Sequence, residues 1–340
     1  MYTRVSAEGI LIAMTHVDDT LISGSDDAGR GRLIKELGDK FKLKNLGPVE
    51  LVLGMEVRRT GLGPILLSQE RFARETLEKF GMSDCKPAPT PAPAGVQLSV
   101  DQCPQTDAER ATMATFPYRE LVGHLNYLAN NTRPDIAPAV SDLGRFMSNP
   151  GMAHWQLGKR ILRYIKGTPG KGINFSGSRG DAPILTAYVD ADFAECKDTR
   201  KSHTGFVLFI NGMPVSWKGR KKQGCVATSS THAEYIALFH AIREVVYMRQ
   251  LLLELQHDQK GPTTIFEDNQ GAIAIAKNPV NHARTKHIDI KFHYIREQVR
   301  LGSVKLKYIP TADQVADVLT KALGKAKFTR FRATLLGEGL

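Results

Sequence analysis

The sequence predicts an α/β protein whose residues 181–322 form a mixed five-stranded sheet flanked by helices. Three strand-like stretches follow one another after residue 184. A long segment with helical spacing comes next, and shorter strands then alternate with helices. Three antiparallel strands followed by strand and helix alternation are typical of a mixed sheet covered by helices.

Residues 1–84 are expected to form a smaller α/β unit. Between residues 9 and 24, two apolar runs flank Thr15-His16-Val17-Asp18-Asp19, which predicts a hairpin with two carboxylates at its tip. The other elements expected in this unit are helices over 26–41 and 69–80 and strands over 50–58 and 64–68.

A proline-rich linker is expected over residues 85–112. Prolines stand at every second position from Pro87 to Pro93, which favours an extended, polyproline-like chain with no packed core of its own. From 113 to 180 the apolar spacing is helical, and Pro134, Pro138 and Pro150 cut it into pieces. We expect a helical connecting module there.

The elements of residues 181–322 follow from periodicity and helix start signals. Strands are expected over 185–189, 205–210 and 214–218, with 226–229 completing the third. Thr231 and Glu234 match a capping box, which predicts the start of a long helix. The remaining expectations are strands over 263–267 and 304–309, helices over 272–277 and 288–301, a last helix over 311–319, and a basic tail over 323–340.

Composition favours an intracellular protein with a polyanionic partner. The chain has 46 Lys and Arg residues against 35 Asp and Glu residues, a formal net charge of +11. Its four cysteines form no C-x-x-C pair, which makes a disulfide framework or a zinc ribbon unfavourable. No stretch approaches the roughly 18 apolar residues of a membrane span, and no secretory signal is visible. We expect a cytoplasmic or nuclear protein that is neither secreted nor bound to a membrane.

Four acidic residues stand at expected strand ends or in helices: Asp190, Glu234, Asp268 and Asp317. Hydrolysis of a phosphodiester needs an activated water and a stabilised leaving oxygen, and two divalent ions about 4 Å apart supply both. Mg²⁺ takes oxygen ligands and keeps several waters, so three or four converging carboxylates suffice. The pattern therefore predicts a two-metal site.

Each carboxylate also has a simpler explanation. Glu234 could complete a capping box, and Asp190 could be part of a polar strand end that includes Asp192. Asp268 could be a turn residue before a helix, and Asp317 could be a solvated residue at a helix end. One shared explanation for all four is more economical than four separate ones.

The sequence around the carboxylates resembles the RNase H domain of Copia-type LTR retrotransposon polyproteins. The matching words are Tyr188-Val189-Asp190-Ala191-Asp192-Phe193-Ala194, Arg200-Lys201-Ser202, Ser216-Trp217-Lys218, Ser229-Ser230-Thr231-His232-Ala233-Glu234-Tyr235, Asp268-Asn269-Gln270, Arg284-Thr285-Lys286-His287-Ile288-Asp289 and Ala316-Asp317-Val318-Leu319-Thr320-Lys321. Segments further upstream resemble the palm end, thumb and connection of the same polyproteins. Examples are Leu53-Gly54-Met55-Glu56, Thr132-Arg133-Pro134-Asp135-Ile136 and Leu162-Arg163-Tyr164-Ile165-Lys166-Gly167. The resemblance covers nearly the whole chain.

The resemblance implies an RNase H-like domain that cleaves the RNA strand of RNA–DNA hybrids with two Mg²⁺ ions, or with Mn²⁺. It makes Asp190, Glu234, Asp268 and Asp317 both the catalytic residues and the metal ligands. It further implies that nucleic acid is bound by Gln270, Asn269, Arg284, Lys286, Lys291 and Arg296. Such enzymes recognise the shape and the 2′-hydroxyls of the hybrid rather than its sequence.

Two departures from the family pattern stand out. Cellular RNases H carry a histidine before the last acidic helix, and this chain has none after His293, which implies either slower turnover or another group in that role. In the incomplete reverse transcriptase part, Asp18 and Asp19 match the polymerase carboxylates, but His16 replaces the expected tyrosine. The third polymerase aspartate lies outside this sequence. We expect Asp18 and Asp19 to be vestigial, and DNA synthesis to require the N-terminal reverse transcriptase portion as a partner.

Three hypotheses compete. The leading hypothesis is a ribonuclease H, and the main alternative is a non-catalytic nucleic-acid-binding remnant of a decayed retroelement. The third is an unrelated α/β fold with another basic-surface role, such as membrane binding. The four retained carboxylates favour the first hypothesis, whereas the altered polymerase part favours the second.

Overall fold

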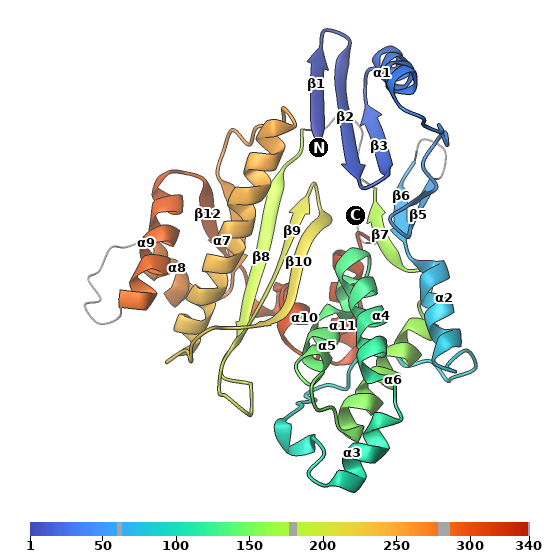
Figure 1. Cartoon of the computed structure of the whole chain (residues 1–340). Helices are drawn as coiled ribbons and strands as arrows, with labels where there is room; N and C mark the ends of the chain where they lie inside the picture. The colour runs from blue at the N-terminus through green and yellow to red at the C-terminus, as the bar shows by residue number, and fades with distance from the viewer. Residues whose placement is uncertain (60–62, 177–181, 278–285, 339–340) are drawn as a thin grey trace.

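The computed structural model describes residues 1–59, 63–176, 182–277 and 286–338. The described strands form sheets of five, four and three strands. These sheets lie beside a block of helices (Figure 1). Within these ranges, no helix is long and apolar enough to cross a membrane.

The five-stranded sheet confirms the expected α/β fold class. Its strands lie in the order β10-β9-β8-β11-β12, with β8, β9 and β10 antiparallel and β8, β11 and β12 parallel. The strands are β8 (Leu185–Asp192), β9 (His203–Ile210), β10 (Met213–Lys222), β11 (Thr263–Glu267) and β12 (Val304–Tyr308). Because β8 and β11 are parallel neighbours, their C-terminal ends lie at the same edge of the sheet.

Helices on one face of this sheet enclose a separate core. They are α7 (Ser230–Glu254), α8 (Gln270–Lys277) and α9 (Lys286–Arg300). Phe206 and Leu208 of β9 lie in this core, whereas Val207 and Phe209 lie in the core on the opposite face. Successive strand residues point to opposite faces, so β9 joins the two cores.

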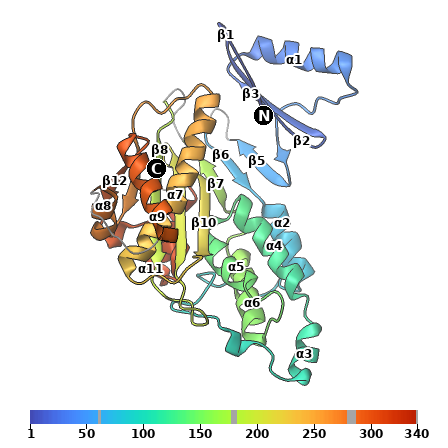
Figure 2. The same ribbon diagram turned by 60° about the vertical axis from the view of Figure 1, so that its left-hand side comes forward.

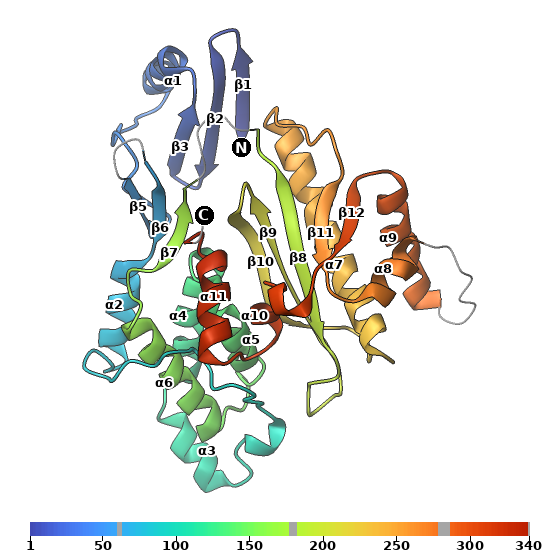
Figure 3. The same ribbon diagram turned by 180° about the vertical axis from the view of Figure 1, so that it is seen from behind.

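The opposite face of the sheet packs against the helical module. Its helices are α3 (Asp107–Ala114), α4 (Tyr118–Asn131), α5 (Ala137–Gly144) and α6 (Met152–Lys166). Figure 3 shows α10 (Asp317–Thr320) and α11 (Lys325–Leu335) on this side. Buried side chains of β9, of the module and of α11 form one continuous core. The sheet therefore shares a core with the module.

Four sequence expectations are wrong in detail. The 226–229 segment does not extend β10, which ends at Lys222 after a register shift. The single strand expected over 50–58 is split into β4 (Leu51–Val52) and β5 (Met55–Arg59), because the chain turns at Leu53 and Gly54 with φ of +47° and +71°. The expected last helix is a 3₁₀ turn followed by the four-residue α10.

The fourth correction concerns the basic tail. The segment contains α11, in which Phe328, Phe331 and Leu335 are buried. These residues recur at intervals of three and four, so they lie on one helical face. Because that face joins the core of the helical module, the C-terminal segment is packed.

The linker also packs more closely than expected. Ala88, Thr90, Ala92 and Leu98 are buried, and the three apolar members lie in the core of the helical module. The chain bends at residues 89–92 and turns at 94–95, and the segment ends in a short 3₁₀ turn and the start of α3. The expected extended, polyproline-like chain is therefore wrong around the prolines, because these bends place the small apolar side chains against the core.

The N-terminal unit holds the remaining sheets. Strands β1 (Tyr2–Ser6), β2 (Gly9–His16) and β3 (Asp19–Gly24) form one sheet, next to which α1 (Asp27–Lys40) lies (Figure 2). The other sheet has the order β4-β5-β6-β7, where β6 is Ile65–Ser68 and β7 is Gly172–Phe175, and α2 (Glu70–Lys79) follows β6. Strand β7, which the sequence did not predict, ties the end of the helical module to this unit.

Candidate metal centre

Three of the four predicted carboxylates come together at the edge where β8 and β11 end. One carboxylate oxygen from each of Asp190, Glu234 and Asp268 takes part, and these three oxygens all lie within 4.8 Å of one another. Asp190 lies in β8, Glu234 in α7 and Asp268 directly after β11. Asp190 and Glu234 are buried, and Asp268 is partly exposed. The three oxygens can therefore face a single cation that is reached from solvent past Asp268.

Glu234 does not cap its helix. Helix α7 begins at Ser230, and the side chain of Ser229 accepts a hydrogen bond from the backbone N–H of His232. The capping box expected from Thr231 and Glu234 is therefore wrong, because an earlier serine already fills that role. Glu234 lies one turn inside the helix with 6% of its surface exposed. Its carboxylate is free for a different use.

Asp317 lies next to the cluster but is bound by lysines. Lys321 Nζ lies 2.7 Å from one carboxylate oxygen of Asp317, and Lys327 Nζ contacts the other oxygen. Lys321 Nζ also lies 3.3 Å from Asp190 Oδ2. Asp317 is only 2% exposed, so it is not a solvated residue of a helix end. The Lys321 ammonium therefore links Asp317 to the carboxylate cluster.

Burial sets the protonation of Asp190. Loss of hydration raises its pKa to about 7, Lys321 opposes this rise, and the charge of Asp317 adds to it. The hydroxyl of Thr320 donates a hydrogen bond to Asp190 Oδ2. Near neutral pH this carboxyl group is poised between its two protonation states.

A fifth acidic residue, Glu267, was missed by sequence reasoning. It is the last residue of β11 and is fully buried, and its Oε1 accepts a hydrogen bond from the backbone N–H of Asn269. Burial raises the pKa of Glu267 and that of Glu234 well above the usual range. Repulsion from Glu267 contributes to the shift of Glu234. Thr263, Ile265 and Glu267 alternate on the buried face of β11, so an acid at a core position was the available signal.

Two oxygens of this acidic group have no partner. Oε2 of Glu234 and Oε2 of Glu267 are buried and accept no hydrogen bond from any described residue. Buried polar atoms in folded proteins nearly always have partners. A divalent cation would supply one, and hard oxygen donors suit Mg²⁺ and Mn²⁺. The donor set therefore fits such an ion.

The residues after Asp268 lie beside the carboxylates. Asn269 caps α8, because its Oδ1 accepts a hydrogen bond from the N–H of Ala272. Gln270 is the first residue of α8 and is exposed. Thr311 donates a hydrogen bond to Asp268 Oδ2 over 2.7 Å. Gln270 is therefore free to contact a ligand, whereas Asn269 already has a structural role.

The basic residues expected to bind nucleic acid have different environments. Arg296 donates a hydrogen bond to the carbonyl of Ile275 and so fastens α9 to α8. Lys291 Nζ lies 5.7 Å from the ring centroid of Phe239. Arg284 lies outside the described residues, and Lys286 is the first residue of α9. The structure therefore leaves Lys291 more available to a ligand than Arg296.

The two N-terminal carboxylates occupy the expected hairpin tip. His16 pairs with Asp19 across β2 and β3, which leaves Val17 and Asp18 as the turn. Asp18 and Asp19 are both exposed. They belong to a different sheet from the carboxylate cluster.

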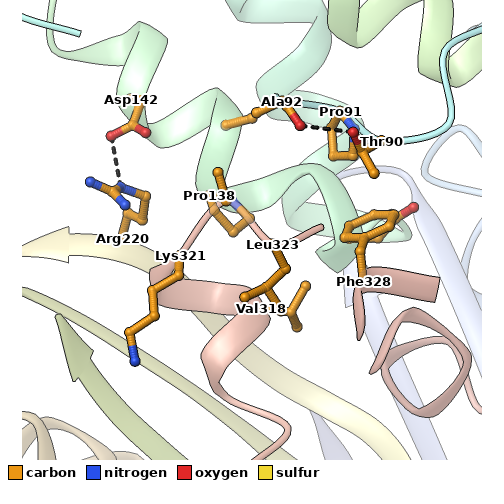
Figure 4. Close-up of a pocket in the computed structure, with 13 residues that line it drawn as sticks. Thr90, Pro91, Ala92, Pro138, Asp142, Arg220, Val318, Lys321, Leu323 and Phe328 are labelled. Atoms are coloured by element: carbon orange, nitrogen blue, oxygen red, sulfur yellow. Dashed lines mark hydrogen bonds and ion pairs between the residues drawn. The ribbon is translucent and has the colours of Figure 1, made fainter. Parts of the chain in front are cut away.

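Arg220 connects the helical module to the carboxylate cluster. Its guanidinium lies 2.9 Å from Asp142 of α5 and 3.5 Å from Asp192 of β8, and it donates a hydrogen bond to the carbonyl of Thr320. Figure 4 shows Arg220 and Asp142 beside a cavity of about 20 Å³ that Lys321 and Phe328 also line. Such a cavity holds about one water molecule, so this junction is tightly packed. Arg220 thereby helps to place Thr320, which contacts Asp190.

Comparison with known proteins places these features in a family. Residues 1–94 match the family model described as reverse transcriptase (RNA-dependent DNA polymerase). The chain is 42% identical over 328 residues to the retrovirus-related Pol polyprotein from transposon TNT 1-94 of Nicotiana tabacum, covering 96% of this chain and 24% of the relative. It is 38% identical to the retrovirus-related Pol polyprotein from transposon RE1 of Arabidopsis thaliana, covering 98% of this chain and 22% of the relative.

The chain thus spans less than a quarter of the length of these two relatives. Among solved structures, the foamy viral protease-reverse transcriptase in complex with double-stranded DNA is similar with a TM-score of 0.47 and 14% identity, covering 88% of this chain and 55% of that one. Sequence similarity along almost the whole chain shows the family. The chain belongs to the Copia-type retrovirus-related Pol polyproteins.

Proposed function

We propose that this chain is a metal-dependent ribonuclease H that hydrolyses the RNA strand of RNA–DNA hybrids. The observation that carries the proposal is the convergence of Asp190, Glu234 and Asp268 within 4.8 Å, next to two buried oxygens without a partner. A protein gains no stability from such an arrangement without a cation, because neighbouring buried carboxylates repel one another.

In this proposal Asp190, Glu234 and Asp268 hold Mg²⁺ or Mn²⁺, and Asp317 completes the acidic set. A pair of such ions supplies an activated water and stabilises the leaving oxygen. Metal ligands must be deprotonated, so binding displaces the proton from Asp190, whose pKa is about 7. Thr320 and Lys321 keep the Asp190 carboxylate oriented. The exposed Gln270 is placed to contact the hybrid.

A non-catalytic nucleic-acid-binding role is the second candidate. One observation favours it: Lys321 and Lys327 neutralise Asp317, so this carboxylate already has cationic partners. Under that alternative, the lysines replace a metal ion and the chain binds nucleic acid without cleaving it.

The test measures cleavage of a labelled RNA–DNA hybrid by the whole chain with Mg²⁺. The whole chain is needed because the sheet shares a core with the helical module and α11. We expect the wild type to shorten the RNA strand and to leave duplex DNA intact, and we expect Asp190→Asn to be inactive. Asp258→Asn, which removes an exposed carboxylate distant from the cluster, should keep full activity. Equal inactivity of a folded, hybrid-binding wild type and Asp190→Asn would favour the non-catalytic role.

A further inference from the structure

A second charged site lies on α7, away from the carboxylates. Lys221 of β10, Arg243 of α7 and Lys291 of α9 surround the neighbouring side chains of Phe239 and His240. Arg243 Cζ and Lys291 Nζ each lie 5.7 Å from the ring centroid of Phe239. We call Lys218, Lys221, Arg243 and Lys291 the α7 basic cluster.

The charges of this cluster act on one another. Burial lowers the pKa of Lys221, and the charges of Lys218, Arg243 and Lys291 lower it further. Burial and the charges of Lys221, Lys291 and Arg243 bring the pKa of His240 down to about 4, so the imidazole is neutral at pH 7. Its Nδ1 lies 3.2 Å from Lys221 Nζ, at a distance where a neutral ring accepts a hydrogen bond. The fold therefore tolerates concentrated positive charge here.

No carboxylate whose side chain the structure describes forms an ion pair with the cluster. Glu244 is near enough to raise the pKa of Lys221, but its Oε1 accepts a hydrogen bond from Ser216 over 2.7 Å. Elsewhere, cations such as Arg133 and Arg220 pair with aspartates. Like charges without counter-charges repel and destabilise a fold, so their concentration indicates a polyanionic ligand.

The cluster lies on the same side of the sheet as Glu234. In the sheet register, Lys221 of β10 pairs with Thr204 of β9, and Thr204 pairs with Ala191 of β8, the neighbour of Asp190. Lys221 is therefore level with the catalytic edge. It lies two strand spacings, roughly 10 Å, from β8. Arg243 follows Glu234 by nine residues, roughly 14 Å along α7. At about 3.4 Å per base pair, these separations correspond to about three to four base pairs of a duplex.

We propose that the α7 basic cluster binds the phosphate backbone of an RNA–DNA hybrid about three to four base pairs from the carboxylate cluster. The identity of the ligand as a hybrid rests on the proposed function. The expected interface therefore extends from α9 across α7 to the edge strand β10. Arg296, which is committed to the carbonyl of Ile275, is not part of it.

The test separates binding from cleavage. Binding of a fluorescent RNA–DNA hybrid is measured by anisotropy over a range of salt concentrations, with EDTA present and in the Asp190→Asn background. The variant is Lys221→Gln with Arg243→Gln. The control is Lys260→Gln with Lys305→Gln, which has the same net charge and removes exposed lysines at the opposite end of the sheet. Thermal unfolding verifies that both proteins are folded.

We expect the cluster variant to reduce the slope of log K against log salt by about 2 and to weaken binding roughly 60-fold at 0.1 M salt. The control should bind like its parent. An equal loss in both double variants, or no loss in the cluster variant, would overturn the inference. So would a cluster variant that loses binding to phosphatidylserine vesicles but keeps hybrid binding, because the ligand would then be a membrane.

The two proposals fail separately. If the wild type with Mg²⁺ leaves the hybrid uncut while the cluster variant still loses binding, the nuclease proposal fails and the binding surface stands. If the hybrid is cut and the cluster variant binds normally, the binding surface fails and the nuclease proposal stands.

Discussion

Replacing Asp190 by asparagine should stabilise the metal-free protein at alkaline pH. The folded carboxyl group has a pKa of about 7 against an ordinary value of 3.8. At about 1.4 kcal/mol for each pH unit between the two values, ionisation of the buried group opposes folding by up to about 4 kcal/mol. Asparagine keeps the acceptor for Thr320 and carries no charge. Allowing for the lost Lys321 contact, we expect Asp190→Asn to raise the free energy of unfolding by about 2 to 3 kcal/mol at pH 8.

The sign of the pH dependence is specific. Because the pKa is raised by folding, the stability that it contributes is fully present below pH 3.8 and is lost as pH rises through 7. Wild type and Asp190→Asn should therefore differ little at pH 4 and most at pH 8. Saturating Mg²⁺ should stabilise the wild type by about 2.7 kcal/mol at 100 times its Kd and should stabilise the variant much less.

The assay is urea unfolding with EDTA or Mg²⁺ at both pH values, followed by far-ultraviolet circular dichroism and by tryptophan fluorescence. Trp217 of β10 and Trp155 of α6 both pack against the core that the sheet shares with the helical module, so tryptophan fluorescence reports that core. An Asp190→Asn protein that is less stable than the wild type at pH 8 without metal would refute the reasoning. A stability difference that is the same at pH 4 and pH 8 would also refute it.

Three further predictions concern the surroundings of the site. Lys321→Met should tighten Mn²⁺ binding several-fold in calorimetry, because its ammonium no longer competes with the metal ion for the carboxylates. Replacing the exposed Lys325 by methionine should leave Mn²⁺ binding unchanged. Weaker Mn²⁺ binding by Lys321→Met would contradict this prediction. Phe331→Ala should lower the free energy of unfolding by about 3 to 5 kcal/mol, because Phe331 is buried. Replacing the exposed Thr329 of the same helix by alanine should change the free energy of unfolding little. Equal effects of the two substitutions would show that α11 is not packed as described. Arg220→Gln should destabilise the protein by about 3 to 5 kcal/mol in urea unfolding, since it removes a charged partner that Asp142 and Asp192 share, and a neutral effect would count against the connection it makes.

Elements with local signals could be predicted well. The strands of the five-stranded sheet and the helix after β10 follow from alternation and helical spacing, which depend on residues close in sequence. The hairpin of β2 and β3 is equally local. Strand β7 escaped prediction because its four residues gain their partner from β6, about a hundred positions earlier. The capping box of Thr231 was wrong because Ser229 competes for the same role.

The residues of the candidate site also fall into two groups, those that the local sequence predicts and those that depend on tertiary packing. Asp190 and Asp268 were predictable because each follows an apolar strand, and parallel neighbouring strands end at one edge. Glu267 was missed although it ends the strand expected over 263–267, because the sequence does not show that this strand end is buried beside the other carboxylates. The ion pairs of Asp317 with Lys321 and Lys327 depend on how α10 and α11 pack against the sheet, and no local pattern encodes that packing.

The sequence by itself determined the family, the α/β class and the set of acidic residues, because these depend on residue identity and short-range periodicity. Only the tertiary structure decided which carboxylates meet. It brought Asp190, Glu234 and Asp268 together and placed a lysine between Asp190 and Asp317. It also converted an apparent basic tail into a packed helix. The physical reason is that burial and charge proximity arise only when segments distant in sequence share one core.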